Sequence, residues 1–109
     1  MALNHLQSGE VANLHATGAD AVSSQSVALF KSEQLEVIRL VLPAGRVMPM
    51  HAVPGEVTIH CLEGTIELET PALRQRLQPG QMLFLRGGEP HALTGVENAS
   101  VLVTIVLRS

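Results

Sequence analysis

Turn-forming residues interrupt this chain at short intervals and leave little room for a helix. Pro and Gly, which favour turns and break regular hydrogen-bond ladders, help to mark breaks at residues 43–45, 54–55, 63–64, 70–72, 78–80 and 86–90. The runs between the breaks consist mainly of Val, Leu and Ile, which favour strands. The pattern predicts strands at residues 27–29, 35–42, 47–53, 57–62, 65–69, 73–77, 82–85, 91–93 and 100–107. Short strands with closely spaced turns are typical of an all-β sandwich or barrel.

Residues 1–26 lack this pattern, because small and polar residues dominate them. We predict an extended N-terminal segment over residues 1–26, which packs on the barrel or on a partner subunit, and a barrel over residues 27–109. His5 and His15 lie in the N-terminal segment. An exposed histidine in an irregular segment is the simplest interpretation of each.

Composition argues against several classes of function. The formal net charge is −3, and no cluster of Lys and Arg is present, which argues against nucleic-acid binding because that depends on phosphate neutralisation. No apolar run approaches the ~20 residues of a membrane span, so we expect no membrane partner. Cys61 is the only cysteine, so no intrachain disulfide can form. This fits a reducing cytoplasm.

Two of the predicted strands are apolar on both faces. They are LEVIRLVL at residues 35–42 and SVLVTIVL at residues 100–107. One face of each would fill the barrel, and the other needs a cover as well. A homodimer interface is the simplest cover.

Two histidine-bearing stretches have regular spacing. In the first, Gly45 is followed by five residues and then His51, and a glycine closes the stretch at position 64. In the second, Gly80, Gly88 and His91 follow one another. These stretches resemble the two motifs of the cupin family. The resemblance implies a cupin-type double-stranded β-helix (jelly-roll) barrel, usually dimeric.

The chain departs from the cupin motifs where the family holds its metal. In cupin metalloenzymes, two histidines and a glutamate of the first motif and one histidine of the second bind the ion. Here Val53 and Val57 stand at two of these positions, so only His51 and His91 carry over. Arg86 and Gly95 replace a Pro and an Asn of the second motif.

A divalent Fe, Mn, Zn or Ni ion would therefore need another ligand. Glu56 is one position early and would point inward if the strand contained a bulge. The alternative is that Glu56 faces solvent. Strand alternation places Cys61 inward with Ile59, where a cysteine is more often a small buried hydrophobe than a ligand. Alternation also places Met48 and Met50 on the face opposite to His51, and His60 outward.

The expected cavity suggests a small-molecule site. We predict that it is lined by His51, Val53, Val57, Ile59, Cys61, His91 and Leu93. An apolar cavity with a few convergent polar groups is typical of ligand binding, and imidazoles can act as acids and bases near neutral pH. Arg86 and Glu89 would lie at its mouth.

Three functions therefore stay open. The first is a small-molecule-binding barrel. The second is a metal-dependent enzyme of the dioxygenase or isomerase type, with His51, His91 and Glu56 as ligands. The third is a structural barrel with a vestigial pocket.

Overall fold

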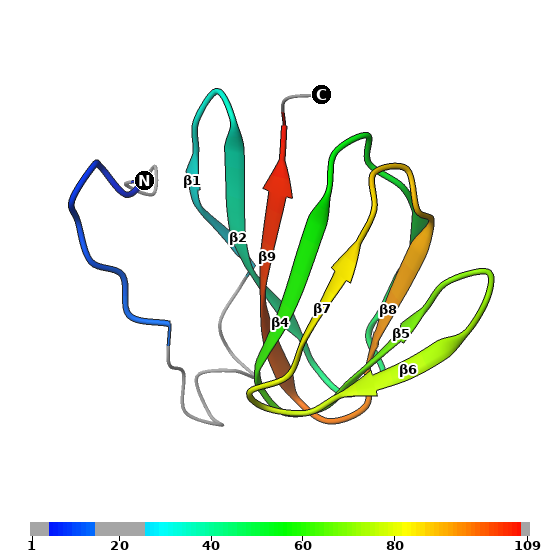
Figure 1. The fold of residues 1–109 in the computed structure, drawn as a ribbon. Helices are drawn as coiled ribbons and strands as arrows, with labels where there is room; N and C mark the ends of the chain where they lie inside the picture. The colour runs from blue at the N-terminus through cyan, green and yellow to red at the C-terminus, as the bar shows by residue number, and fades with distance from the viewer. Residues whose placement is uncertain (1–4, 15–25, 108–109) are drawn as a thin grey trace.

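The structure is a sandwich of two antiparallel β-sheets (Figure 1). This computed structural model describes residues 5–14 and 26–107. Within these ranges it contains no helix, and hence no helix long and apolar enough to cross a membrane. The predicted all-β fold class is confirmed.

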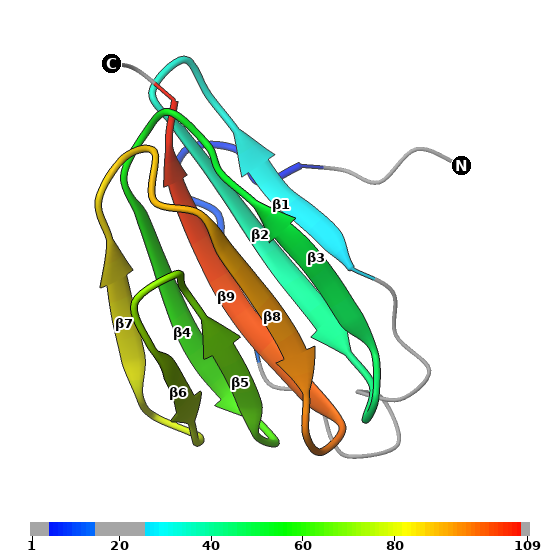
Figure 2. The same cartoon turned by 90° about the vertical axis from the view of Figure 1, so that its right-hand side faces the viewer.

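Each sheet has a simple order of strands. The five-stranded sheet has the order β1-β2-β9-β4-β7, and the four-stranded sheet has the order β3-β8-β5-β6. Figure 2 looks onto the four-stranded sheet, with the five-stranded sheet behind it. The strands are β1 (Val27–Lys31), β2 (Leu35–Leu42), β3 (Val47–His51), β4 (Val57–Glu63), β5 (Ile66–Glu69), β6 (Arg74–Leu77), β7 (Met82–Leu85), β8 (His91–Gly95) and β9 (Ala99–Val106).

The predicted strands occur in the predicted order, and the main difference lies at the end of β3. This strand ends at His51 rather than at residue 53. The reason is a contact between two loops, because the Gly88 N–H donates a hydrogen bond to the Val53 carbonyl at 2.8 Å. The backbone beyond His51 therefore leaves the ladder with β8 and pairs with the loop that precedes His91.

The core lies between the two sheets and is aliphatic. Alternation along each strand sends every second side chain inward, and these inward side chains form the buried core cluster. Its largest fully buried members come from β4, β5, β8 and β9; they are Ile59, Cys61, Ile66, Leu68, Leu93 and Val101.

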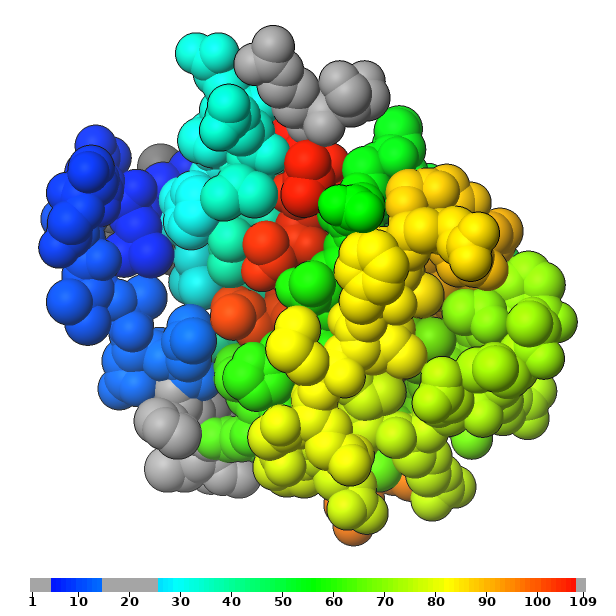
Figure 3. Space-filling view, viewed as in Figure 1, coloured from blue at the N-terminus to red at the C-terminus, as the bar shows by residue number. Residues whose placement is uncertain are grey.

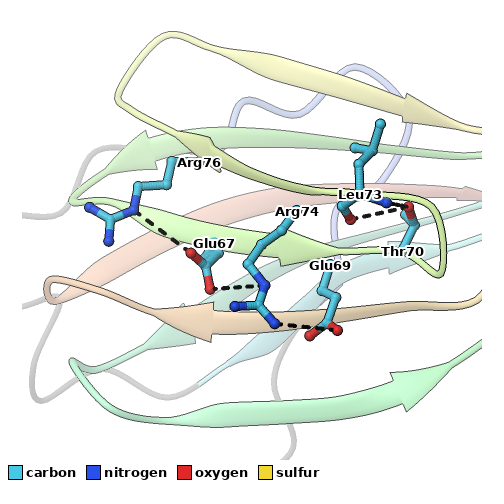
Figure 4. Close-up of polar contacts among 6 residues, drawn as sticks. All are labelled: Glu67, Glu69, Thr70, Leu73, Arg74 and Arg76. Carbon is cyan, nitrogen blue, oxygen red and sulfur yellow. Dashed lines mark hydrogen bonds and ion pairs between the residues drawn. The ribbon is translucent and has the colours of Figure 1, made fainter.

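The outer faces of the two sheets differ in chemistry. On the four-stranded sheet, β5 and β6 carry charges: Arg74 contacts Glu67 at 3.8 Å and Glu69 at 3.6 Å, and Arg76 contacts Glu67 at 3.9 Å (Figure 4). Such exposed ion pairs contribute little to stability, but they keep this face solvated. The outer face of the five-stranded sheet instead exposes Met82 and Phe84, at 60% and 59% of their surface.

The described part of the N-terminal segment runs beside β1 (Figure 1). The Leu6 N–H donates a hydrogen bond to the Leu29 carbonyl at 2.8 Å. His5 is exposed. His15 and the rest of the predicted segment, residues 1–4 and 15–25, lie outside the described residues.

Candidate functional site

The two histidines of the motifs meet on neighbouring strands. His51 at the end of β3 is the register partner of His91 at the start of β8. Their ring centroids lie 4.5 Å apart, with the ring planes tilted by 52°. His91 is 5% exposed, whereas His51 is exposed. One ring therefore lies inside the sandwich and the other at its rim.

The same local bond orients both rings. The Nδ1 atom of His51 contacts the Pro49 carbonyl at 3.1 Å, and the Nδ1 atom of His91 contacts the Glu89 carbonyl at 2.9 Å. A carbonyl oxygen can only accept a hydrogen bond, so each Nδ1 must carry the proton. In the neutral ring, Nε2 is then the atom with the free lone pair. Within the described part of the chain, no hydrogen-bond partner of either Nε2 is found.

The histidines line a cavity between the two sheets. Its volume is about 90 Å³. The five-stranded sheet contributes only aliphatic side chains, and the four-stranded sheet contributes both imidazoles and a thioether. The lining residues are Ile38, Leu40, Met48, His51, Val53, Val57, Ile59, His91, Leu93, Val103 and Ile105.

The direction of the Met48 side chain differs from the prediction. We expected it on the face opposite to His51, but both side chains line the cavity. The register explains this, because Met48 pairs with Leu93 and His51 pairs with His91, so three steps along β3 match two steps along β8. The extra residue is a β-bulge, which reverses the alternation between these two positions. Met50, in contrast, is 45% exposed and does not line the cavity.

Cys61 points inward but lies away from the cavity. It is 0% exposed, and it is absent from the cavity lining. Its Sγ donates weak hydrogen bonds to the Glu63 and Gly64 carbonyls at 3.5 and 3.4 Å. Burial raises the pKa of this thiol. A neutral, enclosed thiol is a poor nucleophile and a poor metal ligand.

Glu56 is exposed and does not line the cavity. Its carbonyl accepts a hydrogen bond from the Val106 N–H at 2.9 Å, and the next residue, Val57, is 3% exposed. Since Val57 points inward, strand alternation turns the Glu56 side chain outward.

Arg86 and Glu89 lie in the loop before His91. Their side chains form an ion pair at 3.8 Å, and the Arg86 side chain is 82% exposed. Neither lines the cavity, but Glu89 supplies the carbonyl that orients His91.

Sequence reasoning missed five lining residues. They are Ile38, Leu40, Met48, Val103 and Ile105. Four of them alternate on β2 and β9, so strand alternation along these two strands could have predicted that they point inward. Met48 has no such signal, because the bulge follows from the pairing of β3 with β8.

Comparison with known families decides what this chain is. The model of the cupin domain matches residues 38–106. The chain is a member of the cupin family. The predicted resemblance is therefore confirmed, and the two sheets with their intervening cavity are the cupin barrel.

Solved structures agree with this assignment. A conserved protein of unknown function from Streptococcus pyogenes is 23% identical, with a TM-score of 0.77 over 97% of this chain and 94% of that one. A cupin superfamily protein from Desulfitobacterium hafniense is 18% identical, with a TM-score of 0.73 over 76% of each chain. The DMSP lyase DddQ from Ruegeria pomeroyi is 27% identical, with a TM-score of 0.69 over 74% of this chain and 45% of that one. Among curated proteins no relative was found.

The residues of this cupin do not fit the divalent metal that the family implies. Within residues 5–14 and 26–107, no group of three or more His, Cys, Asp or Glu side chains can hold a metal ion. Two imidazoles alone fall short of the three or four protein ligands of a zinc site and of the two histidines and a carboxylate of a non-haem iron site. The buried Val57 occupies the position of the family's glutamate.

Proposed function

We propose that this cupin binds a small molecule with a short aliphatic body and a head group that donates hydrogen bonds. The orientation of the two rings supports this proposal most directly. Because both Nδ1 atoms are held by backbone carbonyls, the pair offers two Nε2 acceptors at an otherwise apolar cavity. A buried donor of the ligand would gain a partner there, whereas a ligand without a donor would leave the acceptors unpaired.

The cavity limits the size of the ligand. A cavity of 150 Å³ accommodates benzene, so one of about 90 Å³ suits a ligand with fewer heavy atoms than benzene. Short alcohols, diols and protonated short carboxylic acids meet both requirements. The likeness to a lyase concerns the fold, and a fold does not transfer a reaction. We therefore propose binding without a chemical step.

The test compares ligands that differ only in the donor. Isobutanol and 1,2-propanediol carry a hydroxyl donor, and butanone has a similar size but only accepts. Each would be titrated into the protein while the imidazole signals and the methyl signals of Ile59 and Leu93 are followed by NMR. We expect the donors to bind at least tenfold more tightly than butanone.

Variants then assign the binding to the histidine pair. His51→Ala should weaken binding of the donors, and His60→Ala is the matched control, because His60 lies on β4 outside the cavity lining. Equal affinity for isobutanol and butanone would refute the proposal. Binding of none of them would leave a structural barrel with a vestigial pocket.

We also propose that this cupin is located in the cytoplasm. Cys61 is a free, buried thiol, and proteins of oxidising compartments commonly use their cysteines in disulfides.

We also propose that this cupin forms a homodimer through the outer face of its five-stranded sheet. Two rows of register partners cross β2, β9, β4 and β7 on this face: Arg39, Leu102, His60 and Met82 in one row, and Val37, Thr104, Thr58 and Phe84 in the other. Figure 3 shows side chains of β9 (red) at the surface between those of β2 (cyan) and β7 (yellow). The buried Nε of Arg39 has no hydrogen-bond partner among the described residues, so a second copy would supply both apolar cover and an acceptor.

Light scattering coupled to size exclusion tests the dimer. Phe84→Glu should give a monomer, because it places a charge inside the proposed interface. Val47→Glu is the matched control, since Val47 is also exposed, at 54%, but lies on β3 of the other sheet. A native protein of monomeric mass at micromolar concentration would exclude the interface.

A further inference from the structure

We propose that the cavity is also a binding site for a soft monovalent metal ion, Cu(I), with the Met48 thioether and the Nε2 atoms of His51 and His91 as ligands. The donor set differs from that of the family's motifs, which contain no methionine. It follows instead from the bulge in β3. The proposal rests on the same pair of Nε2 atoms as the proposed function and adds Met48 to it.

The bulge brings the three donors to one wall. Met48 and His51 lie on β3 and His91 lies on β8, the neighbouring strand of the four-stranded sheet. All three side chains line the same cavity. Without the extra residue between Met48 and His51, alternation would turn the thioether to the outer face of the sheet.

The chemistry of the donors selects the ion. Thioethers are soft ligands that favour Cu(I), and imidazole is also suited to copper. Mg²⁺, Ca²⁺ and Mn²⁺ prefer carboxylate and carbonyl oxygens, whereas the other lining residues are aliphatic. All three donors are neutral, so a bound ion keeps its full charge in an apolar cavity. Desolvating a single charge costs less than desolvating a double one, which favours a monovalent ion over Zn²⁺.

The geometry of the histidine pair suits a shared ion. The centroids of the two rings are 4.5 Å apart. Metal–imidazole bonds are ~2.0 Å long, so the centre of a ring lies about 3 Å from an ion that it binds, and this centroid separation lets one ion reach both rings. The backbone carbonyls that hold both Nδ1 protons provide the outer contacts that commonly fix the orientation of metal-binding histidines.

A competition titration under anaerobic conditions tests the site. Cu(I), kept reduced with ascorbate, is partitioned between the full chain and the chromophoric chelator bicinchoninate. We expect one Cu(I) per chain at this site. Met48→Leu conserves the shape of the side chain but removes the sulfur, and we expect it to weaken binding at least tenfold. Met50→Leu is the matched control, because Met50 is the neighbouring methionine of β3 outside the cavity.

A second measurement excludes binding by the cysteine. Thiols also bind Cu(I), and Cys61 lies buried elsewhere in the core. In protein with ¹³C-labelled methionine methyl groups, Cu(I) should shift the Met48 signal and leave the Met50 and Met82 signals in place. Equal affinities of the native and Met48→Leu chains, or an unshifted Met48 methyl, would refute the site.

The two proposals fail in different ways. If the native chain binds isobutanol but not Cu(I), the metal site alone is wrong. If it binds neither, the inference that both Nε2 atoms are accessible in the cavity is wrong, and both proposals are refuted.

Discussion

His51 and His91 share a local geometry but differ in their surroundings. Each ring is held by the carbonyl of the residue two positions before it. His91, however, belongs to β8, which has a neighbour on both sides, and it is 5% exposed. His51 ends β3, an edge strand, and is exposed. The pair thus joins a ring fixed by packing to a ring positioned by its edge strand, which suggests that His91 anchors the site while His51 admits the ligand.

The largest expected effect is on the free energy of unfolding, and it tests the difference between the two histidines directly. His91→Ala should lower the free energy of unfolding by about 2–4 kcal/mol, because it leaves a hole in the core and an unpaired Glu89 carbonyl. His51→Ala should lower it by less than about 1 kcal/mol, since the ring is exposed. Urea denaturation of the two variants measures both values. Similar losses for the two would show that the histidines do not divide the roles in this way.

An intermediate effect concerns the contact between the two loops. A Cβ at Gly87, in the loop before His91, would overlap the backbone carbonyl of Pro54, in the loop after His51. Gly87→Ala should therefore lower the free energy of unfolding by about 1–3 kcal/mol and weaken isobutanol binding, because the loops must separate. Calorimetric titration gives the affinity.

Gly80→Ala is the matched control for this loop variant. Gly80 has a positive φ of 89° and open space around it, so alanine costs about 1–2 kcal/mol through backbone strain alone. Its turn lies outside both loops, and the affinity for isobutanol should stay unchanged. An unchanged affinity in the Gly87→Ala chain would show that the loop contact does not set the spacing of the rings.

The sequence predicted the inward side chains of the cavity wall where strand alternation is regular. The prediction was wrong where a β-bulge interrupts the alternation. Val57 and Ile59 follow the period of two, so their inward direction was predictable from β4 alone. The position of Met48 was not, because a bulge depends on how β3 pairs with β8, which are distant in sequence. Glu56 was left open between two registers, and the pairing of Val57 with Ile105, which fixes the register that turns Glu56 outward, is likewise a long-range contact.

The smallest expected effect concerns Arg86, which we expected at the mouth of the cavity. Its side chain is 82% exposed and pairs with Glu89 at 3.8 Å, so Arg86→Ala should change the free energy of unfolding by less than about 0.5 kcal/mol. The affinity for isobutanol should stay within twofold of the native value, because the ligand is neutral and the guanidinium lies outside the lining.

The comparison becomes sharper with a short carboxylate such as butyrate, which only accepts hydrogen bonds and would therefore bind at the rim rather than to the Nε2 acceptors. If Arg86 attracts anions to the rim beside His51, Arg86→Ala will weaken butyrate binding at low salt and leave isobutanol unaffected, and 0.5 M NaCl will abolish that difference. Equal butyrate affinities of the native and variant chains at low salt would mean that the loop acts on the site only through the Glu89 carbonyl, and hence only through the buried histidine.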